Sequence, residues 1–522
     1  MEMDMMLRHL YMPSSKNGEN VLIMKKKSFI ATLIGIIGFL LVGFVVMDIV
    51  RQKWDYESDN AAQMIVEGYY KEPIDSLDVL FLGASTIRNG MSPLEIYEQY
   101  GITGYSRATS VQIPLISYYL MMETLKTQNL KAVVIDASSL SSLTDNSEKM
   151  EGKYHEAIDY MPLSEYKMAI IEKITKGSTY TKWDFLLPLY RYHDRWQQLD
   201  EYDFSYRNVN SDYCYKGQYP ILRVEKYSFP EDYMQEEKIQ DDEFYIEGDA
   251  REYYELMIEE CKKRNIEFIM VKTPVGSWDM AKHDMVQNFA DVEDVDFIDF
   301  NMPDIREEIE FNSETDYCDN GRHPNISGAM KMSRYVGNYI QSHVNMQNRE
   351  GAVLGDWNES VKKYDCLKED QRVLRESNLI KFLKKIDKDR YTVVIAARND
   401  TTKFFTDEIR KAFADLGLSV DMKGASNQNY VAVFKGKKVV YEKQDAADEV
   451  TFSGEVGGIY ISALSKADKA TGNTASIMID GVEKSVQEYG FNILVYDNYV
   501  GQVIARRAFD TGRTGKLYTT KD

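Results

Sequence analysis

The stretch DVLFLGAST, residues 78–86, decides the predicted fold. Its apolar run ends in Gly-Ala-Ser-Thr, as is common where a buried strand gives way to a helix. Helical patterns follow at 93–100 and 114–127, and a second apolar run, KAVVID, comes at 131–136. This succession of strand, helix and strand predicts a parallel sheet.

The same alternation resumes later in the chain. A helical pattern covers 250–264, and apolar runs at 266–272 and 295–300 predict two further strands before a last helix at 325–343. Between the two halves, residues 145–245 are rich in Tyr, Asp and Glu. We expect them to form a mostly helical cap, inserted over the edge of the sheet.

These patterns predict an α/β domain over residues 54–345. A charged, partly helical stretch at 346–377 is expected to link it to a C-terminal domain over 378–522, where a helix at 407–416 stands among short β-rich runs. At 522 residues the chain is too long for one core, and its 44% hydrophobic residues exclude wholesale disorder.

One N-terminal transmembrane helix is predicted at residues 28–47. The run is uncharged, and at about 1.5 Å per residue it matches a hydrocarbon core of about 30 Å. Lysines at 25–27 precede it, whereas basic residues beyond it are diluted by acidic ones, which predicts a cytoplasmic leader at 1–27. We expect a single-pass protein with its bulk outside a bacterial cell; the alternative is a cleaved signal peptide.

Charge and metal-ligating residues exclude several classes of function. The chain has 83 Asp and Glu against 63 Lys and Arg, and a net charge of −20 without a basic stripe argues against a nucleic-acid partner. The four cysteines contain no CxxC pair and the six histidines no HExxH motif. We therefore expect no metal site, and nothing in the sequence calls for a cofactor.

Two residues are candidates for nucleophilic catalysis. Ser85 follows the first strand at the carboxyl edge of the sheet, where open α/β sheets gather their ligands. A serine hydroxyl needs a base to remove its proton, and His323, directly before the last helix, is the candidate base. On its own, a Gly-Ser turn is equally what a connection from strand to helix uses.

Three motifs, taken together, carry a family resemblance: VLFLGASTIRNGMSP at 79–93, YSRATSVQIP at 105–114 and CDNGRHPNISGA at 318–329. Their order and spacing resemble the SGNH hydrolases, in particular the membrane-anchored branch that includes DltD-like and alginate-acetylation proteins. The resemblance implies an SGNH-type, flavodoxin-like parallel sheet with helices on both faces. It also implies that Ser85 is the nucleophile and His323 its base.

The residue that orients His323 is open between two neighbours. The family spacing of three residues selects Asn320, whereas Asp319 lies four residues before His323. We expect Asp319, because a carboxylate stabilises imidazolium better than an amide and Gly321 can accommodate one extra residue.

The family's usual oxyanion-hole residues are not evident in the sequence. The backbone N–H groups of Ser85 and Ala108, with the Gln112 amide, are the candidate donors in their place. The segment RYHDRW at 191–196 also resembles an aromatic and basic segment of this branch, and we expect it to pack within the cap.

The C-terminal region resembles a second family, the interleukin-like EMT inducer or GG domain. The resemblance rests on the runs at 390–418, 430–443, 457–465 and 476–497, and on a closing RAFDT at 507–511. It implies a small β-sandwich-like α+β domain with flanking helices and, by analogy with a related stem domain, glycan binding. Tyr430 and Tyr460 are weak candidates for sugar contacts, since packing is the commoner use of a strand tyrosine.

Two functions follow from these resemblances. The first is an extracytoplasmic, membrane-anchored serine esterase or O-acyltransferase that modifies a cell-envelope or secreted polysaccharide. The family resemblance implies a membrane-bound O-acyltransferase as its partner. The second is a membrane-anchored glycan-binding or scaffolding protein whose SGNH fold has lost catalysis.

Overall fold

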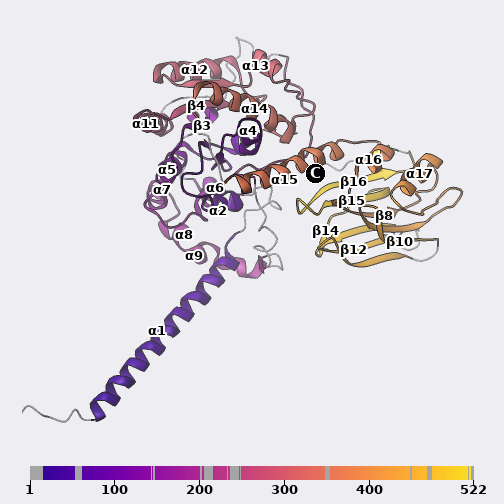
Figure 1. The fold of residues 1–522 in the computed structure, drawn as a ribbon, viewed down its shortest axis with the longest axis horizontal. Coiled ribbons are helices and arrows are strands. Elements are labelled where there is room, and N and C mark those ends of the chain that lie inside the picture. The colour runs from indigo at the N-terminus through magenta and orange to yellow at the C-terminus, as the bar shows by residue number, and fades with distance from the viewer. Residues whose placement is uncertain are drawn as a thin grey trace, which may run out of the picture. The chain divides into compact units, whose positions relative to one another are not determined.

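The computed structural model forms two compact units (Figure 1). The first combines Met1–Lys53 with Tyr180–Ser211, and the second combines Trp54–Thr179 with Asp212–Asp522. The region predicted as a cap, 145–245, is therefore divided between them. The structure describes residues 16–52, 62–142, 144, 147–199, 203–204, 215–231, 233–234, 246, 248–346, 353–446, 449–466, 473–514 and 516–518. Parts of the predicted leader and cap lie outside these residues.

The first unit contains the long helix α1, Lys16–Val50. Its stretch Phe29–Val50 has a mean hydropathy of 2.8 and is long and apolar enough to cross a membrane, as a signal anchor or a span. Most of the large apolar side chains between Phe29 and Val46 are exposed. The unit also contains α8, Lys182–Leu186, α9, Pro188–Tyr192, and the 3-10 helix η2, His193–Gln198.

The second unit begins with a five-stranded parallel sheet. Its strands are β1 (Val79–Leu82), β2 (Gly104–Ser106), β3 (Ala132–Asp136), β4 (Glu267–Lys272) and β5 (Asp296–Asp299). They are ordered β2-β1-β3-β4-β5, which is the strand order of flavodoxin-like sheets. The predicted parallel sheet is confirmed, and the pattern analysis missed only the short β2.

Helices cover both faces of this sheet (Figure 1). One face carries α3 (Ser85–Gly90), α4 (Pro93–Tyr100) and α14 (Ile326–His343), which share a core with alternate strand residues. The other carries α5 (Pro114–Thr124), α11 (Gly248–Arg264) and α12 (Met280–Glu293). The remaining elements are α2 (Ala62–Tyr69), η1 (Ala137–Ser141), α6 (Glu148–Ile158), α7 (Glu165–Thr175), α13 (Pro303–Glu308), and a hairpin of β6 (Tyr317–Asp319) and β7 (His323–Pro324).

The stretch predicted as a linker forms the helix α15, Val353–Leu374. Trp357, Tyr364 and Leu367 on this helix are buried. Lys368 also donates to the buried Glu95 of α4 at 3.1 Å. Residues 353–374 therefore pack on the α/β domain as a rigid element, which a flexible tether would not do.

The C-terminal region forms two antiparallel sheets. One has the order β10-β9-β8-β15-β16-β17 and the other β11-β12-β13-β14. The strands are β8 (Tyr391–Arg398), β9 (Asn429–Lys435), β10 (Lys438–Asp445), β11 (Val450–Val456), β12 (Ile459–Lys466), β13 (Thr474–Ile479), β14 (Val482–Glu483), β15 (Gly490–Asp497), β16 (Gln502–Asp510) and β17 (Lys516–Tyr518). One apolar core joins the sheets face to face, and α16 (Leu379–Lys385) and α17 (Asp407–Asp415) cover the outer face of the larger one.

Candidate active site

Ser85 lies at the turn where β1 ends and α3 begins. The turn depends on Gly83, whose φ of +127° favours glycine, and a Cβ at this position would overlap that of Asp136 in β3. The backbone of the turn therefore approaches the neighbouring strand closely. This approach presents the serine at the carboxyl edge of the sheet.

The fold joins Ser85 to His323, although 238 residues separate them in sequence. Ser85 Oγ lies 2.7 Å from His323 Nε2, within hydrogen-bonding distance. His323 is in β7, immediately before α14, which packs on the same face of the sheet as α3. The two predicted residues are thus brought together by the packing of α14 beside α3.

Asp319 lies on the other side of the His323 ring. Its Oδ2 is 2.6 Å from His323 Nδ1, and its Oδ1 accepts from the His323 backbone N–H at 2.7 Å. Burial opposes ionisation of this carboxyl, but the hydrogen bonds and charge of His323 hold the pKa of Asp319 below its ordinary value. Asn320 is exposed, so Asp319 is the residue placed to orient the ring.

The four-residue spacing between Asp319 and His323 is closed by a tight turn. The Arg322 N–H donates to the Asp319 carbonyl at 2.9 Å, and the two ends of the turn face each other across the β6–β7 hairpin. Gly321 adopts a φ of +72°, and a Cβ there would overlap the ring of Tyr227. Glycine at 321 is what allows the longer spacing.

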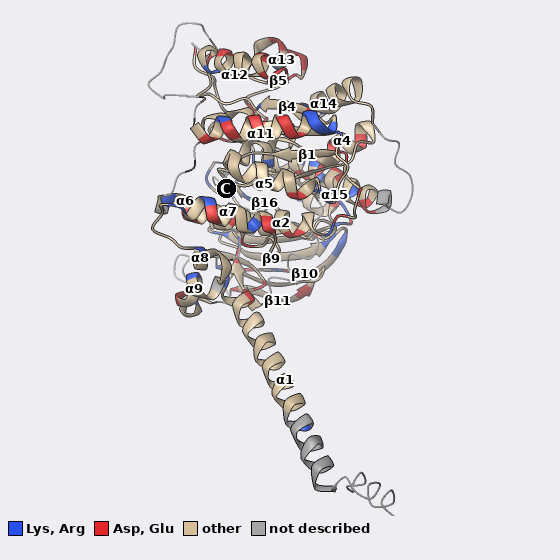
Figure 2. Ribbon diagram, turned by 90° about the vertical axis from the view of Figure 1, so that its left-hand side faces the viewer, with Lys and Arg blue, Asp and Glu red and all other residues tan. Residues whose placement is uncertain are grey.

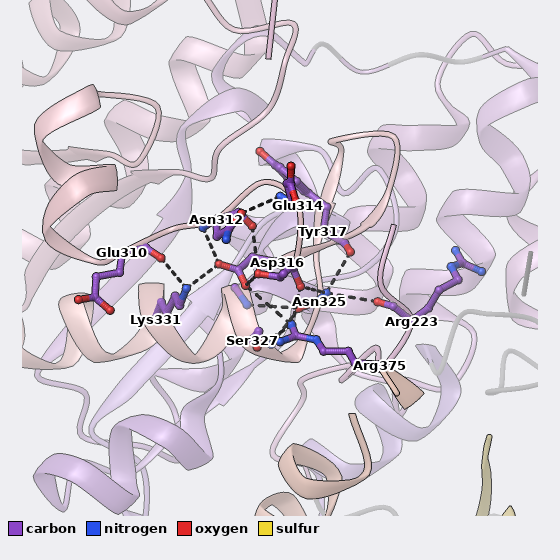
Figure 3. Close-up of polar contacts among 12 residues, drawn as sticks. Arg223, Glu310, Asn312, Glu314, Asp316, Tyr317, Asn325, Ser327, Lys331 and Arg375 are labelled. Carbon is purple, nitrogen blue, oxygen red and sulfur yellow. Dashed lines mark hydrogen bonds and ion pairs between the residues drawn. The ribbon is translucent and has the colours of Figure 1, made fainter. Parts of the chain in front are cut away.

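Asn325 fixes the chain two residues after His323 (Figure 3). Its Oδ1 caps α14 by accepting from Ser327 N at 2.9 Å. Its Nδ2 donates to the carbonyls of Thr315 at 2.8 Å and Tyr317 at 3.0 Å. One buried amide therefore ties the start of the helix to the strand that leads to Asp319.

Asp316 extends this network toward α15 (Figure 3). Its carboxylate accepts from Asn312 N at 2.8 Å and from Lys331 Nζ at 2.8 Å. Arg375, which follows α15, donates to the Thr315 carbonyl at 2.6 Å. The segment that supports the histidine is thus held by contacts from three parts of the chain.

The three side chains are partly accessible. The side chains of His323 and Asp319 are 24% and 30% exposed, and Ser85 is half-buried. A hydroxyl, an imidazole and a carboxylate in this order form a proton-transfer chain that can activate the hydroxyl for attack on a carbonyl carbon.

The candidate oxyanion donors lie beside the serine turn. Residues 107–109 run along the end of β1, with Arg107 N donating to Phe81 O at 2.9 Å and Thr109 N to Gly83 O at 3.3 Å. Ala108 between them is fully buried. The Gln112 amide is committed elsewhere, because it donates to Ser117 Oγ at 2.9 Å and accepts from Thr109 Oγ1 at 3.0 Å.

Asp136 is a site residue that the sequence analysis did not select. Its Oδ2 accepts from Thr86 Oγ1 at 2.6 Å, and its Oδ1 accepts from Ser138 Oγ at 2.6 Å. It therefore fastens the residue next to Ser85 to the end of the adjacent strand. Its position as the last residue of the KAVVID run was the signal, since polar residues at this edge of a parallel sheet gather around ligand sites.

The two tyrosines proposed for sugar binding have different environments. Tyr430 is fully buried among Phe413 and Phe491, and its hydroxyl donates to Glu442 at 2.9 Å. Its ring is not accessible to a sugar, which removes it from the candidate surface. Tyr460 on β12 is 52% exposed and stays a candidate.

The segment 191–196 is also placed differently from the expected cap packing. Trp196 is 64% exposed, and Arg195 contacts the end of α1. Within the part of the chain that the structure describes, no group of three or more His, Cys, Asp or Glu side chains is placed to hold a metal ion.

Comparison with known proteins identifies one region. A family model described as interleukin-like EMT inducer matches residues 357–437. The match begins within α15 and ends just after β9, so it includes α16, β8 and α17. No curated protein and no solved structure matches the chain. The interleukin-like EMT inducer match supports the predicted family of the C-terminal domain and leaves the candidate active site outside its bounds.

Proposed function

We propose that this protein is a membrane-anchored serine O-acyltransferase or esterase of the SGNH type, which modifies a cell-envelope or secreted polysaccharide outside the cytoplasm. The supporting observation is the continuous chain from Ser85 Oγ through the His323 ring to the Asp319 carboxylate, with contacts of 2.7 and 2.6 Å. Ser85 lies in one segment and Asp319 and His323 in another, and His323 comes 238 residues after Ser85 in the chain.

In the proposed reaction, His323 Nε2 takes the proton of Ser85 as Oγ attacks the acyl carbonyl. The new Oγ–carbon bond forms, the bond from the acyl carbon to its leaving group breaks, and the leaving group receives the proton from Nε2. Asp319 stays ionised and stabilises the imidazolium. In the second step, His323 Nε2 takes the proton of a second hydroxyl, whose oxygen attacks the carbonyl carbon of the acyl-serine. The bond from that carbon to Ser85 Oγ then breaks, and Oγ takes the proton back from Nε2.

The nature of that second hydroxyl decides between hydrolysis and transfer. Water gives an esterase, and a sugar hydroxyl gives an O-acyltransferase. The partial exposure of the His323 and Asp319 side chains suits a polymeric acceptor, which cannot enter an enclosed cavity. The proposed acyl donor is a membrane-bound O-acyltransferase. In this proposal α1 anchors the protein in the same membrane, with the lysines at 25–27 on the cytoplasmic side.

The developing oxyanion needs donors near Ser85. The proposed donors are the Ser85 backbone N–H at the start of α3 and the N–H of Ala108 in the adjacent segment. The Gln112 side chain contributes only if it leaves Ser117. One missing donor typically lowers the rate about 10²–10³-fold, so the proposed enzyme is a slow one on simple esters.

The proposal is tested with purified full-length protein in detergent. Release of 4-nitrophenol from 4-nitrophenyl acetate is measured for the wild type and for Ser85→Ala, with Ser141→Ala as a control serine, whose hydroxyl donates to the Ser138 carbonyl within η1. The proposal expects turnover that is lost in Ser85→Ala and kept in Ser141→Ala. Turnover equal in wild type and Ser85→Ala, or none in either, contradicts it.

A second candidate function is a tethered glycan-binding protein without catalysis. The observation in its favour is the commitment of the Gln112 amide to Ser117, which removes the one side-chain donor proposed for the oxyanion. Its sugar-binding surface would include Tyr460 on β12. Co-sedimentation of the full-length protein with insoluble envelope polysaccharide, compared between wild type and Tyr460→Ala, tests it: the candidate requires binding that the substitution weakens.

A further inference from the structure

The segment from α8 to Phe204 exposes many large apolar side chains. We call residues 182–199 and 203–204 the aromatic segment. Its outward-facing residues are between 43% and 66% exposed, and they are Trp183, Leu187, Leu189, Tyr190, Trp196 and Phe204. Soluble surfaces rarely carry so many large apolar side chains in so short a stretch, so the exposure calls for a ligand or a surface that covers it.

The aromatic segment belongs to the same compact unit as the long apolar helix α1. α9 and η2 both contact α1, and Figures 1 and 2 show α9 near one end of that helix. Arg195 makes polar contacts there: its Nη1 donates to the carbonyl oxygens of Ile49, Val50 and Arg51 at 3.4, 3.3 and 3.2 Å. Its Nη2 donates to Asp203 at 2.6 Å.

These carbonyls are the ones that a helix leaves without partners at its C-terminal end. A cation there also complements the negative end of the helix dipole. Arg195 therefore acts as a C-terminal cap of α1, and it holds the aromatic segment at the level where the apolar run Phe29–Val50 ends.

The end of a membrane-spanning helix lies in the headgroup region, and Trp and Tyr favour that region because one edge of the ring is apolar and the other polar. Basic side chains with long apolar stems suit it as well. The aromatic segment supplies both, with Lys182 and Arg191 among the exposed rings.

We propose that the aromatic segment is a second membrane contact, which lies in the headgroup region of the leaflet where α1 ends and binds phospholipid. The inference rests on α1 as a membrane span and is independent of the catalytic proposal. It also explains why part of the predicted cap belongs to the same compact unit as α1.

The buried packing of this part of the chain is provided by other aromatic side chains. Tyr180 and Phe185 are buried and meet edge to edge with ring centroids 5.7 Å apart. Phe185 is thus the inward-facing ring of the aromatic segment and packs on Tyr180 just before it, while Trp183 and Tyr190 are exposed. The segment therefore has two apolar sides, of which the chain itself covers one.

The test uses the full-length protein in nanodiscs of phosphatidylethanolamine and phosphatidylglycerol. A fraction of the lipid carries a diazirine close to the headgroup, and adducts are mapped by mass spectrometry after illumination. The proposal expects peptides from 182–199 to carry severalfold more adducts than the peptide with Tyr460, an equally exposed aromatic residue of the C-terminal domain. Adducts within 29–50 report separately that α1 is in the bilayer.

Variants sharpen the result. Replacing Trp196 and Tyr190 together by Ser should lower the labelling of 182–199 severalfold without lowering that of α1, and Tyr460→Ser should change neither. Labelled α1 with 182–199 no higher than the Tyr460 peptide overturns the proposal. That outcome is also the one expected if a protein partner, rather than lipid, covers the segment, because the nanodiscs contain no other protein.

Discussion

Three His–Asp pairs lie in the described part of the second unit, at His155–Asp159, His283–Asp299 and His323–Asp319. The first and the last of them differ in what the second ring nitrogen meets. His323 pairs with Asp319 through Nδ1 at 2.6 Å and meets the Ser85 hydroxyl through Nε2 at 2.7 Å. His155 of α6 pairs with Asp159 through Nδ1 at 2.7 Å, and its Nε2 lies 3.7 Å from the carboxylate of Glu151. One ring joins a carboxylate to a nucleophile, and the other lies between two carboxylates.

This difference decides which histidine can act as a base. Burial alone would lower the pKa of His155, but Asp159 and Glu151 overcome it and raise the pKa to about 9. His155 therefore keeps its proton at neutral pH and serves as the cation of a structural ion pair. A histidine beside an aspartate is thus no sign of catalysis by itself. The group that its Nε2 contacts decides whether the histidine can act as a base on a nucleophile.

The largest effect is expected from His323→Ala. The account predicts that kcat on an aryl ester falls by up to about 10⁶-fold, since members of such a triad fail together. The ring is partly exposed and each of its two hydrogen bonds contributes about 0.5–1.5 kcal/mol, so the free energy of unfolding should fall by no more than about 1–3 kcal/mol. Esterase assays and urea denaturation measure the two quantities; a large loss of stability with retained kcat would reverse the assignment of the two histidines.

The next effect separates Asp319 from Asn320. Asp319→Asn should lower kcat about 10⁴-fold, because an amide holds the ring but does not stabilise the imidazolium. Asn320→Ala should leave kcat within about twofold, as expected for an exposed turn residue that makes no ring contact. Equal losses from both substitutions would place the orienting role on the turn as a whole and not on the carboxylate.

His155→Gln is the counterpart on the structural pair. A pKa of about 9 in the folded state against 6.5 for an ordinary histidine corresponds to about 3 kcal/mol of stabilisation by the protonated form. Because the folded pKa is the higher one, that stabilisation is complete below pH 6.5 and is lost as pH rises through 9. The difference in unfolding free energy between wild type and variant should shrink between pH 7 and 10, with kcat per folded molecule unchanged; a difference that grows over this range would contradict the ion pair.

The smallest effect tests the support of the catalytic histidine. Asn325→Ala removes the cap of α14 and should cost about 1–2 kcal/mol of stability. It should also lower kcat about tenfold with little change in KM, since the chain that carries His323 loosens. Asn378→Ala removes the corresponding cap of α16, whose Oδ1 accepts from Lys381 N at 3.1 Å, and should cost similar stability without loss of kcat. Equal kcat losses would show general destabilisation.

Sequence patterns predicted the parallel sheet because its central strands are continuous apolar runs, as in KAVVID at 131–136. The edge strand β2 was not predicted, because Gly104-Tyr105-Ser106 contains no apolar run and is a strand only through its pairing with β1. Residues 346–377 are predicted as a charged, partly helical linker between the two domains. The packing of α15 on the α/β domain is indicated by Trp357, Tyr364 and Leu367, which recur at helical spacing on one face.

The candidate site was predictable in its residues more than in its geometry. The end of a strand indicated Ser85, and the position before the last helix indicated His323, but spacing alone left the orienting residue open. The answer depends on the turn at Gly321, which is a property of the hairpin. Tyr430 could have been recognised as a core residue, because the alternation in YVAVF places it on one face with Ala432 and Phe434.

The most direct test of the proposed triad is covalent labelling of Ser85. The full-length protein is treated with a fluorophosphonate, which reacts with serines that a neighbouring base activates, and the adduct is located by peptide mass spectrometry. The account predicts a single adduct on Ser85 in the wild type, its absence in Ser85→Ala, and strongly slowed formation in His323→Ala. An unmodified Ser85 under conditions that label a known serine hydrolase, or equal labelling in His323→Ala, would contradict it.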